Sequence, residues 1–170
     1  MADVNEKIVQ RYFELKGYMV TTNLKYMIKK KSSGESDIDL AVLRINPPDR
    51  AIIEVKGWHT ETFSMSYFKN VKSDDYRSRL LHFVRSEALQ AAKAFFKSND
   101  FRKILVVPEL SPRDREQIIK MLKEQHDVEV LEFTPILQYV ISMTKENKNY
   151  RDSEFQQTIR LMKAYGFLKE

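Results

Sequence analysis

The sequence contains no cysteine, and only three histidines and four glycines occur among its 170 residues. Without cysteine the chain has no disulfides, no thiolate zinc site and no cysteine nucleophile. The histidines, His59, His82 and His126, show neither short ligand spacing nor an obvious shared helix face, so we do not expect a zinc site. The glycines are too far apart for the dinucleotide-binding fingerprint or for the phosphate-binding loop of nucleotide hydrolases. The sequence therefore contains neither of the usual glycine-rich motifs that indicate a bound nucleotide cofactor.

Long apolar runs are missing as well. No uninterrupted apolar stretch approaches the roughly 20 residues that a membrane-spanning helix requires. The first ten residues also lack the apolar block of a signal peptide. We therefore expect a cytoplasmic protein that has no membrane partner.

The composition is typical of a folded domain, since hydrophobic residues make up 42% of the chain and charged residues 31%. A single core accommodates 170 residues. We expect one domain over residues 1–170, with its core at about 1–133 and a C-terminal helical extension at about 134–170. The net charge of +5 favours an anionic partner, but a charge this small is also common among proteins that bind no nucleic acid.

Strands and helices are predicted from the spacing of apolar residues. The predicted strands are residues 18–28, 36–45, 51–56, 103–107 and 128–133. The predicted helices are residues 4–15, 76–98, 113–125, 135–144 and 153–165, with glycines closing the first and the last. Residues 60–75 are expected to form a loop over the candidate site. Strands that alternate with helices after an initial hairpin favour an α/β fold, in which a mixed central sheet is flanked by helices.

Charged side chains gather on the predicted central hairpin. Glu54 and Lys56 lie two residues apart on one strand, so they project from the same face. If the numbers of paired residues sum to an odd value such as 93 or 95, Asp37 and Asp39 lie on that face too. The opposite face of the preceding strand is then apolar, with Ile38, Leu40 and Val42. An even sum would bury Glu54 among these apolar side chains at a cost of several kcal/mol, so we expect the odd register.

Such a cluster suits a divalent cation, because one or two carboxylates completed by water and substrate phosphate are what Mg²⁺ prefers. Bound Mg²⁺ lowers the pKa of a water molecule and neutralises charge that builds up on phosphate oxygens. Lys56, a compact point charge, is suited to stabilise the same negative charge. The alternative is a solvated hairpin face with ordinary cross-strand ion pairs.

Asp39, fourteen intervening residues and then Glu54, Val55 and Lys56 resemble the D...(D/E)xK pattern of the PD-(D/E)XK, or restriction-endonuclease-like, nuclease superfamily. Within that superfamily, residues 6–18, 34–40 and 53–57 are most similar to the archaeal Holliday-junction-resolvase-like branch. That branch carries a glutamate on its first helix, which Glu6 matches here.

The resemblance implies a restriction-endonuclease-like three-layer sandwich and a metal-dependent endonuclease that hydrolyses phosphodiester bonds in nucleic acid, with DNA as the expected substrate. It implies Asp39 and Glu54 as ligands of Mg²⁺ or Mn²⁺, Lys56 as the catalytic lysine, Glu6 as an outer carboxylate, and a homodimer. Asp37 is an alternative to Asp39. The proline that nominally precedes the aspartate in this superfamily is missing.

Several residues have alternative interpretations. Glu6 is either part of the site or a surface residue near the positive end of the helix dipole. Lys25, Lys29, Lys30 and Lys31 either contact nucleic-acid phosphates or form a solvated basic turn. Trp58 and His59, which follow the lysine of the motif, either touch the substrate or pack. For the whole chain, the alternatives are a catalytically silent nucleic-acid-binding or scaffold protein of the same fold, and a nuclease directed at RNA.

Overall fold

The structure is a computed structural model that describes residues 3–28, 34–57, 62–68, 80–144 and 154–168. Its centre is a five-stranded sheet in the order β1-β2-β3-β4-β5. The strands are β1 (Met19–Ile28), β2 (Gly34–Arg44), β3 (Asp49–Val55), β4 (Arg102–Val107) and β5 (Val128–Glu132). β1, β2 and β3 pair antiparallel, whereas β3, β4 and β5 pair parallel, which confirms the predicted mixed sheet.

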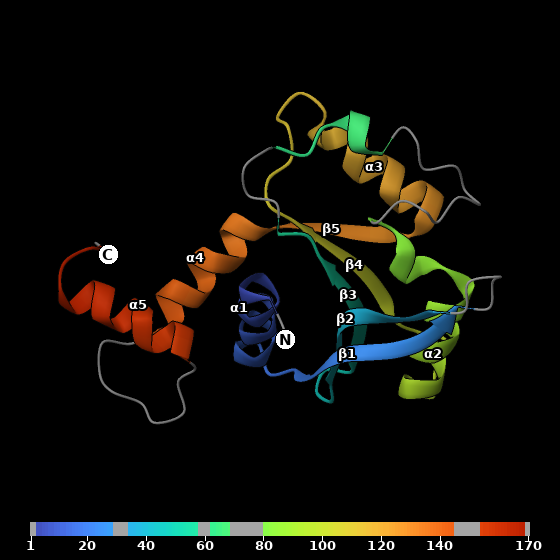
Figure 1. Ribbon diagram of the computed structural model, residues 1–170, viewed down its shortest axis with the longest axis horizontal. Helices are drawn as coiled ribbons and strands as arrows, with labels where there is room; N and C mark the ends of the chain where they lie inside the picture. Colours follow the sequence, from blue (N-terminus) through green and yellow to red (C-terminus); the bar gives the residue numbers. More distant parts are fainter. Residues whose placement is uncertain (1–2, 29–33, 58–61, 69–79, 145–153, 169–170) are drawn as a thin grey trace.

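Helices cover both faces of the sheet. They are α1 (Val4–Leu15), α2 (Ser86–Phe96), α3 (Arg115–His126), α4 (Phe133–Met143) and α5 (Glu154–Ala164), and two short 3₁₀ turns are η1 (Met65–Tyr67) and η2 (His82–Val84). α1 and α4 lie together on one side of the sheet, and α2 and α3 lie on the other (Figure 1). The fold is therefore α/β with three layers. No helix in the described part of the chain is both long and apolar enough to cross a membrane.

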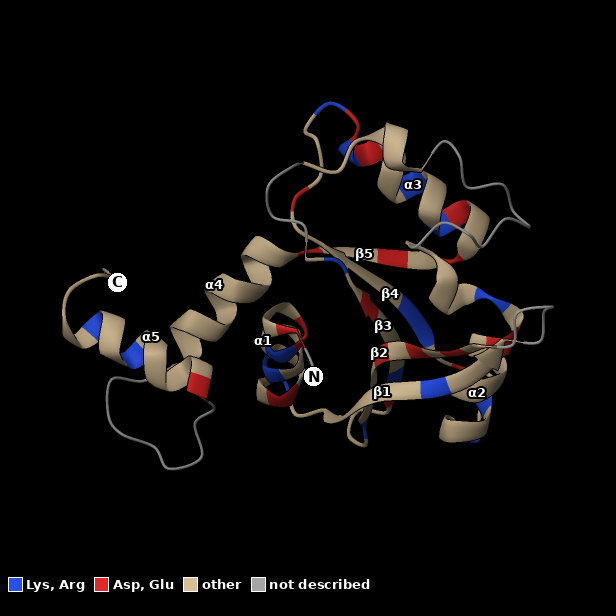
Figure 2. Ribbon diagram, in the orientation of Figure 1, with Lys and Arg blue, Asp and Glu red and all other residues tan. Residues whose placement is uncertain are grey.

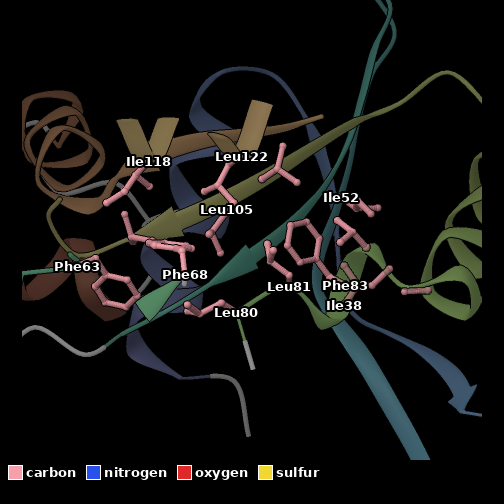
Figure 3. Packing of buried hydrophobic residues seen from close by; sticks show 14 of the residues in the cluster. Ile38, Ile52, Phe63, Phe68, Leu80, Leu81, Phe83, Leu105, Ile118 and Leu122 are labelled. Carbon is pink, nitrogen blue, oxygen red and sulfur yellow. The ribbon is translucent and has the colours of Figure 1, made fainter. Parts of the chain in front are cut away.

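Each face of the sheet has its own apolar core. The core beneath α1 and α4 includes Ile8, Val9, Phe13, Leu40, Val42, Ala51, Ile53, Val55, Ile104, Val106, Phe133 and Ile136. The core beneath α2 and α3 includes Ile38, Ile52, Phe63, Phe68, Leu81, Phe83, Ala88, Leu105, Ile118 and Leu122 (Figure 3). β3 is buried on both faces, which is why its residues 51–53 are all apolar. Burying one such large side chain stabilises the fold by roughly 1.5–3 kcal/mol.

Glycine ends α1 as expected. Gly17 has a φ of 81°, in the region that residues with a Cβ rarely adopt. Its N–H donates to Glu14 O at 2.9 Å, and the N–H of Tyr18 donates to Phe13 O at 3.0 Å, so the last carbonyls of the helix are satisfied. Gly166 likewise has a positive φ, 74°, after α5.

The predicted helix at residues 76–98 is wrong over residues 80–85. α2 begins only at Ser86, and the preceding Arg85 has an extended backbone. Leu81 directly precedes the 3₁₀ turn η2 and Phe83 lies within it, and both side chains are almost completely buried in the core. Tertiary packing of these apolar residues therefore overrides the local helical pattern. Residues 76–79 lie outside the described residues.

The predicted common face of Ile38, Leu40 and Val42 is also wrong. Ile38 packs in the core beneath α2 and α3, whereas Leu40 and Val42 pack in the core beneath α1 and α4. The change of face falls beside Asn23 of the neighbouring strand, whose φ of 54° interrupts the regular alternation of β1. β2 stays paired with β1 on both sides of Asn23, so the change of face in β1 is passed on to β2.

Part of the predicted loop at residues 60–75 is described, and it is anchored. Phe63 forms an isolated parallel bridge with Leu110, in which the N–H of Phe63 donates to Glu109 O and the N–H of Ser111 donates to Phe63 O, each at 2.8 Å. The carboxylate of Asp114 accepts a hydrogen bond from the N–H of Met65 at 2.9 Å. These contacts fix the segment against the start of α3.

An ion-pair network joins β3, β4 and β5 near the N-terminal ends of these strands. Arg102 donates from Nε to Asp49 Oδ1 at 3.0 Å and from Nη2 to Asp49 Oδ2 at 2.6 Å, and its Nη1 donates to Glu129 Oε2 at 3.0 Å. The Tyr18 hydroxyl also donates to Asp49. Burial alone would raise the pKa of Asp49, but hydrogen bonds from Arg102 and Tyr18 outweigh it and hold this pKa below its ordinary value.

Candidate active site

The register of β2 and β3 places the two motif strands as predicted. Leu40 pairs with Ile53 and Val42 with Ala51, so the numbers of paired residues sum to 93. Continued by one residue, the same register puts Asp39 opposite Glu54. The expected odd register is confirmed. Glu54 therefore shares a face with Ile52 and the core beneath α2 and α3, not with the apolar side chains beneath α1.

The Asp39 side chain is fixed where β2 and β3 separate. β2 pairs with β1 from Gly34 to Leu43, whereas it pairs with β3 only from Leu40 to Arg44. At this point Asp39 Oδ2 accepts a hydrogen bond of 2.7 Å from the backbone N–H of Val55. A carboxylate thus takes the place that a backbone carbonyl holds in a regular ladder, and its position is set by β3.

Glu54 is almost completely buried, with 1% of its side chain exposed. Lys56 Nζ donates to Glu54 Oε1, as their shared face requires. The backbone N–H of Lys56 donates to Val106 O at 2.9 Å, so β4 holds the lysine at the end of β3. Glu54 Oε2 is buried and has no hydrogen-bond partner among the residues that the structure describes. An orphaned buried carboxylate oxygen is expensive and is a common mark of a site that holds an ion or a ligand.

α1 brings its first turn to the same place. A Cβ built on Gly57 would lie 2.1 Å from Asn5 Nδ2 and 3.2 Å from Asp3 Oδ2, so the start of α1 lies directly against the backbone that follows Lys56. Among the described residues, Glu6 Oε2 is buried without a hydrogen-bond partner. Figure 2 shows acidic positions on α1, β2 and β3, the elements that meet here. Burial and then the charge of Asp39 raise the pKa of Glu6, so Glu6 lies near Asp39, and its role as an outer carboxylate stays a prediction.

The pKa values of the carboxyl groups are raised. Burial is the main cause of the raised pKa of Glu54, and the charge of Asp39 adds to it while Lys56 opposes it. Burial is also the main cause of the raised pKa of Asp39, and it outweighs the N–H of Val55 and the ammonium of Lys56, which both lower this pKa. The pKa of Glu6 is raised by burial and then by Asp39. These carboxylates repel one another in a poorly solvated place, so a cation between them would be stabilised.

His82 is a site residue that the sequence interpretation missed. Its Nε2 lies 3.4 Å from Glu54 Oε2, on the side of the carboxylate away from Lys56. It reaches this position from η2, far along the chain from the motif. The available signal was a single polar residue within the apolar run Leu80, Leu81, Phe83 and Val84, but a pattern of this kind shows burial of its neighbours and not the direction of the histidine.

The predicted basic contacts are described only in part. Lys25 lies on β1 and is 63% exposed, and its Nζ pairs with Glu35 Oε2 at 2.8 Å. Lys29, Lys30 and Lys31 lie outside the described residues, as do Trp58 and His59. The charge of Asp37 adds to the raised pKa values of Glu6, Asp39 and Glu54, and its part as an alternative to Asp39 stays a prediction.

Within the described ranges, no group of three or more His, Asp or Glu side chains is placed to hold a metal ion. A divalent cation at this site would therefore rely on two protein carboxylates, Asp39 and Glu54, and on water or substrate oxygens for its other ligands. Mg²⁺ commonly binds in this way, with one or two carboxylates and substrate phosphate. The hard oxygen donors and the orphaned Glu54 Oε2 fit such an ion.

Comparison of the chain with family models, curated proteins and solved structures gives no match. The geometry therefore has to support any function on its own. It assembles two carboxylates from adjacent strands, a largely buried ammonium group at the end of β3, and a further carboxylate from α1. Such a set can bind a divalent cation and stabilise negative charge that develops on a phosphate.

Proposed function

We propose that this protein is a metal-dependent nuclease that hydrolyses phosphodiester bonds in nucleic acid, with DNA as its substrate. The observation that carries the proposal is the pairing of β2 and β3 with a sum of 93, which brings Asp39 beside Glu54 and Lys56. Asp39 and Glu54, fifteen positions apart in the sequence, and Lys56, two positions further on, thereby form one cluster.

The fold supports the same proposal. An antiparallel hairpin that carries the motif, continued by parallel strands and covered by helices on both faces, is the arrangement expected of a restriction-endonuclease-like domain. Function resides in the site and not in the fold, so this support is secondary.

Asp39 and Glu54 would hold Mg²⁺ or Mn²⁺. When bound, such an ion supplies a Lewis acid and a water molecule of lowered pKa. Asp39 is held in place by the N–H of Val55, and Glu54 is held by its burial and by Lys56. Both ligands are therefore oriented before substrate arrives, which reduces the reorganisation needed for the reaction.

Lys56 would stabilise the charge that develops on the phosphate. Its side chain is 13% exposed, so its ammonium group lies where the solvent is largely excluded and where a charge interaction is stronger than in water. Glu6 would act as an outer carboxylate, since α1 places it within reach of the charge of Asp39.

A catalytically silent nucleic-acid-binding or scaffold protein is the second candidate. One observation favours it: Lys56 pairs with Glu54 Oε1 in a buried ion pair of the kind that also occurs in purely structural positions. In that case the cluster would serve the fold alone.

The two candidates differ in a cleavage assay. Purified protein is incubated with plasmid DNA, branched DNA and RNA in the presence of Mg²⁺, Mn²⁺ or a chelator, beside Lys56→Ala and Asp39→Asn. The nuclease predicts metal-dependent cleavage that falls by about 10²-fold or more in Lys56→Ala, because one charge-stabilising group is lost. Arg113→Ala is a matched cationic control, since Arg113 is 85% exposed and lies outside the site.

Each outcome of the assay has a distinct meaning. Cleavage by the wild-type protein that is lost in both site variants supports the nuclease. Binding of nucleic acid at low salt without cleavage of any substrate supports the scaffold. Cleavage that survives in both site variants contradicts the proposed site. Selective cleavage of RNA would keep the site and change the substrate.

A further inference from the structure

The turn η2 is built to present one polar side chain to the site. Leu81 is 1% exposed and Phe83 is fully buried, and these two residues flank His82 in the chain. Figure 3 shows both side chains beside Ile38 and Ile52, on the strands that also carry Asp39 and Glu54. The backbone of the turn is thus anchored on both sides of the histidine.

Hydrogen bonds fix the same turn. The N–H of Val84 donates to Leu81 O and the N–H of Arg85 donates to His82 O, each at 3.2 Å. The Tyr26 hydroxyl, which comes from β1, donates to His82 O at 3.4 Å. The turn itself and β1 therefore both fix the backbone that carries the imidazole.

The imidazole of His82 lies beside Oε2 of Glu54, the carboxylate oxygen that Lys56 does not contact. Lys56 pairs with Oε1, and His82 Nε2 is 3.4 Å from Oε2, which is otherwise buried without a hydrogen-bond partner. A separation of 3.4 Å is long for a strong hydrogen bond. Hydrogen bonds of groups at catalytic sites commonly tighten when a ligand binds.

We propose that His82 is a positioning residue that holds the Glu54 carboxylate from its Oε2 side, so that Lys56 and His82 together set the orientation of a metal-ligating carboxylate. The inference rests on the proposed function, in which Glu54 is a ligand of the divalent cation. His82 acts through Glu54: its Nε2, 3.4 Å from Oε2, limits rotation of the carboxylate, and its N–H would donate to that oxygen when the site binds its cation. Partners of this kind typically change metal affinity by about 10- to 100-fold when they are removed.

The test is isothermal titration of Mn²⁺ into the full-length protein and into His82→Ala, His82→Gln and Glu54→Gln. Glutamine carries an amide N–H at about the reach of Nε2, so it keeps a donor toward Glu54, whereas alanine does not. His126→Ala is a matched histidine control, because His126 lies in the last turn of α3 and has no place in the site. Thermal unfolding without metal shows whether each variant is folded.

The inference predicts that His82→Ala weakens Mn²⁺ binding by about 10- to 100-fold and that His82→Gln restores most of the affinity. His126→Ala binds like the wild-type protein. Equal affinity of His82→Ala and the wild-type protein would overturn the inference and leave the proposed function intact. Failure to recover affinity in a well-folded His82→Gln would also overturn it.

The failure of the proposed function looks different. If the wild-type protein and Glu54→Gln give the same titration, Glu54 is not a ligand, and both the proposed function and the role of His82 are wrong. If Glu54→Gln loses binding and His82→Ala does not, only the role of His82 is wrong.

Discussion

The Asp39 carboxylate accepts a hydrogen bond of 2.7 Å from the backbone N–H of Val55, at the point where β2 separates from β3. The Asp39 side chain thus links β2 to β3 where their ladder ends, and it contributes a charge to the candidate site. The two roles can be separated, because an amide can accept the same hydrogen bond without carrying the charge.

Asp39→Asn and Asp39→Ala should therefore differ in stability. Asn keeps an oxygen that can accept from Val55, whereas Ala leaves a part-buried N–H without its partner, at a cost of about 1–3 kcal/mol. Urea unfolding without divalent metal measures both variants, and we predict that only Asp39→Ala shows this loss. Mn²⁺ binding should be lost in both. Equal stability of the two variants would mean that the Val55 contact does not matter to the fold.

Glu54 should make the metal-free protein less stable as the pH rises. Its pKa is raised well above the ordinary value of 4.5, mainly by burial, so the folded state holds the proton more tightly than the unfolded chain does. The stabilisation by this group is present in full below pH 4.5 and is lost as the pH rises through the raised pKa. Unfolding free energies measured from pH 4 upward should therefore fall for the wild-type protein relative to Glu54→Gln. Parallel curves would contradict the raised pKa.

Asp49 should show the opposite dependence. Arg102 and Tyr18 hold its pKa below the ordinary value of 3.8, so its stabilisation is present above that pH and is lost as the pH falls through the lowered pKa. Asp49→Asn should lose about 2 kcal/mol at neutral pH, because two hydrogen bonds to a charged group are weakened. The difference from the wild-type protein should shrink in acid. A difference that stays constant from pH 7 to pH 2 would contradict the account.

Asn23 should require a backbone that tolerates positive φ. At a φ of 54°, Asn23→Gly is expected to be close to neutral, whereas Asn23→Val should cost roughly 1–2 kcal/mol because a β-branched residue is strained there. Thermal or urea unfolding of the two variants checks this. If valine were tolerated as well as glycine, the change of face between Ile38 and Leu40 would need another cause.

The local pattern of the sequence predicted the sheet and the motif well. Alternation along residues 53–56 and the cost of burying Glu54 beside Leu40 and Val42 were enough to choose the odd register, which the structure has. The end of α1 at Gly17 was likewise predictable from local chemistry, because only a glycine suits its backbone.

Features that depend on distant parts of the chain could not be predicted. Ile38 lies on the other face from Leu40 because of the backbone at Asn23, fifteen positions earlier, and an alternating pattern contains no trace of this. His82 reaches Glu54 because Leu81 and Phe83 pack into a core formed by other strands. The expected homodimer and the basic contacts at Lys29, Lys30 and Lys31 stay predictions.

The central claim is that Asp39 and Glu54 share one divalent cation, and anomalous diffraction tests it most directly. Crystals of the wild-type protein soaked in Mn²⁺ should give an anomalous difference peak at about 2.0–2.3 Å from a carboxylate oxygen of each residue, and the peak should vanish in Glu54→Gln. Wild-type crystals without a peak at this place, or with one that persists in Glu54→Gln, would contradict the account.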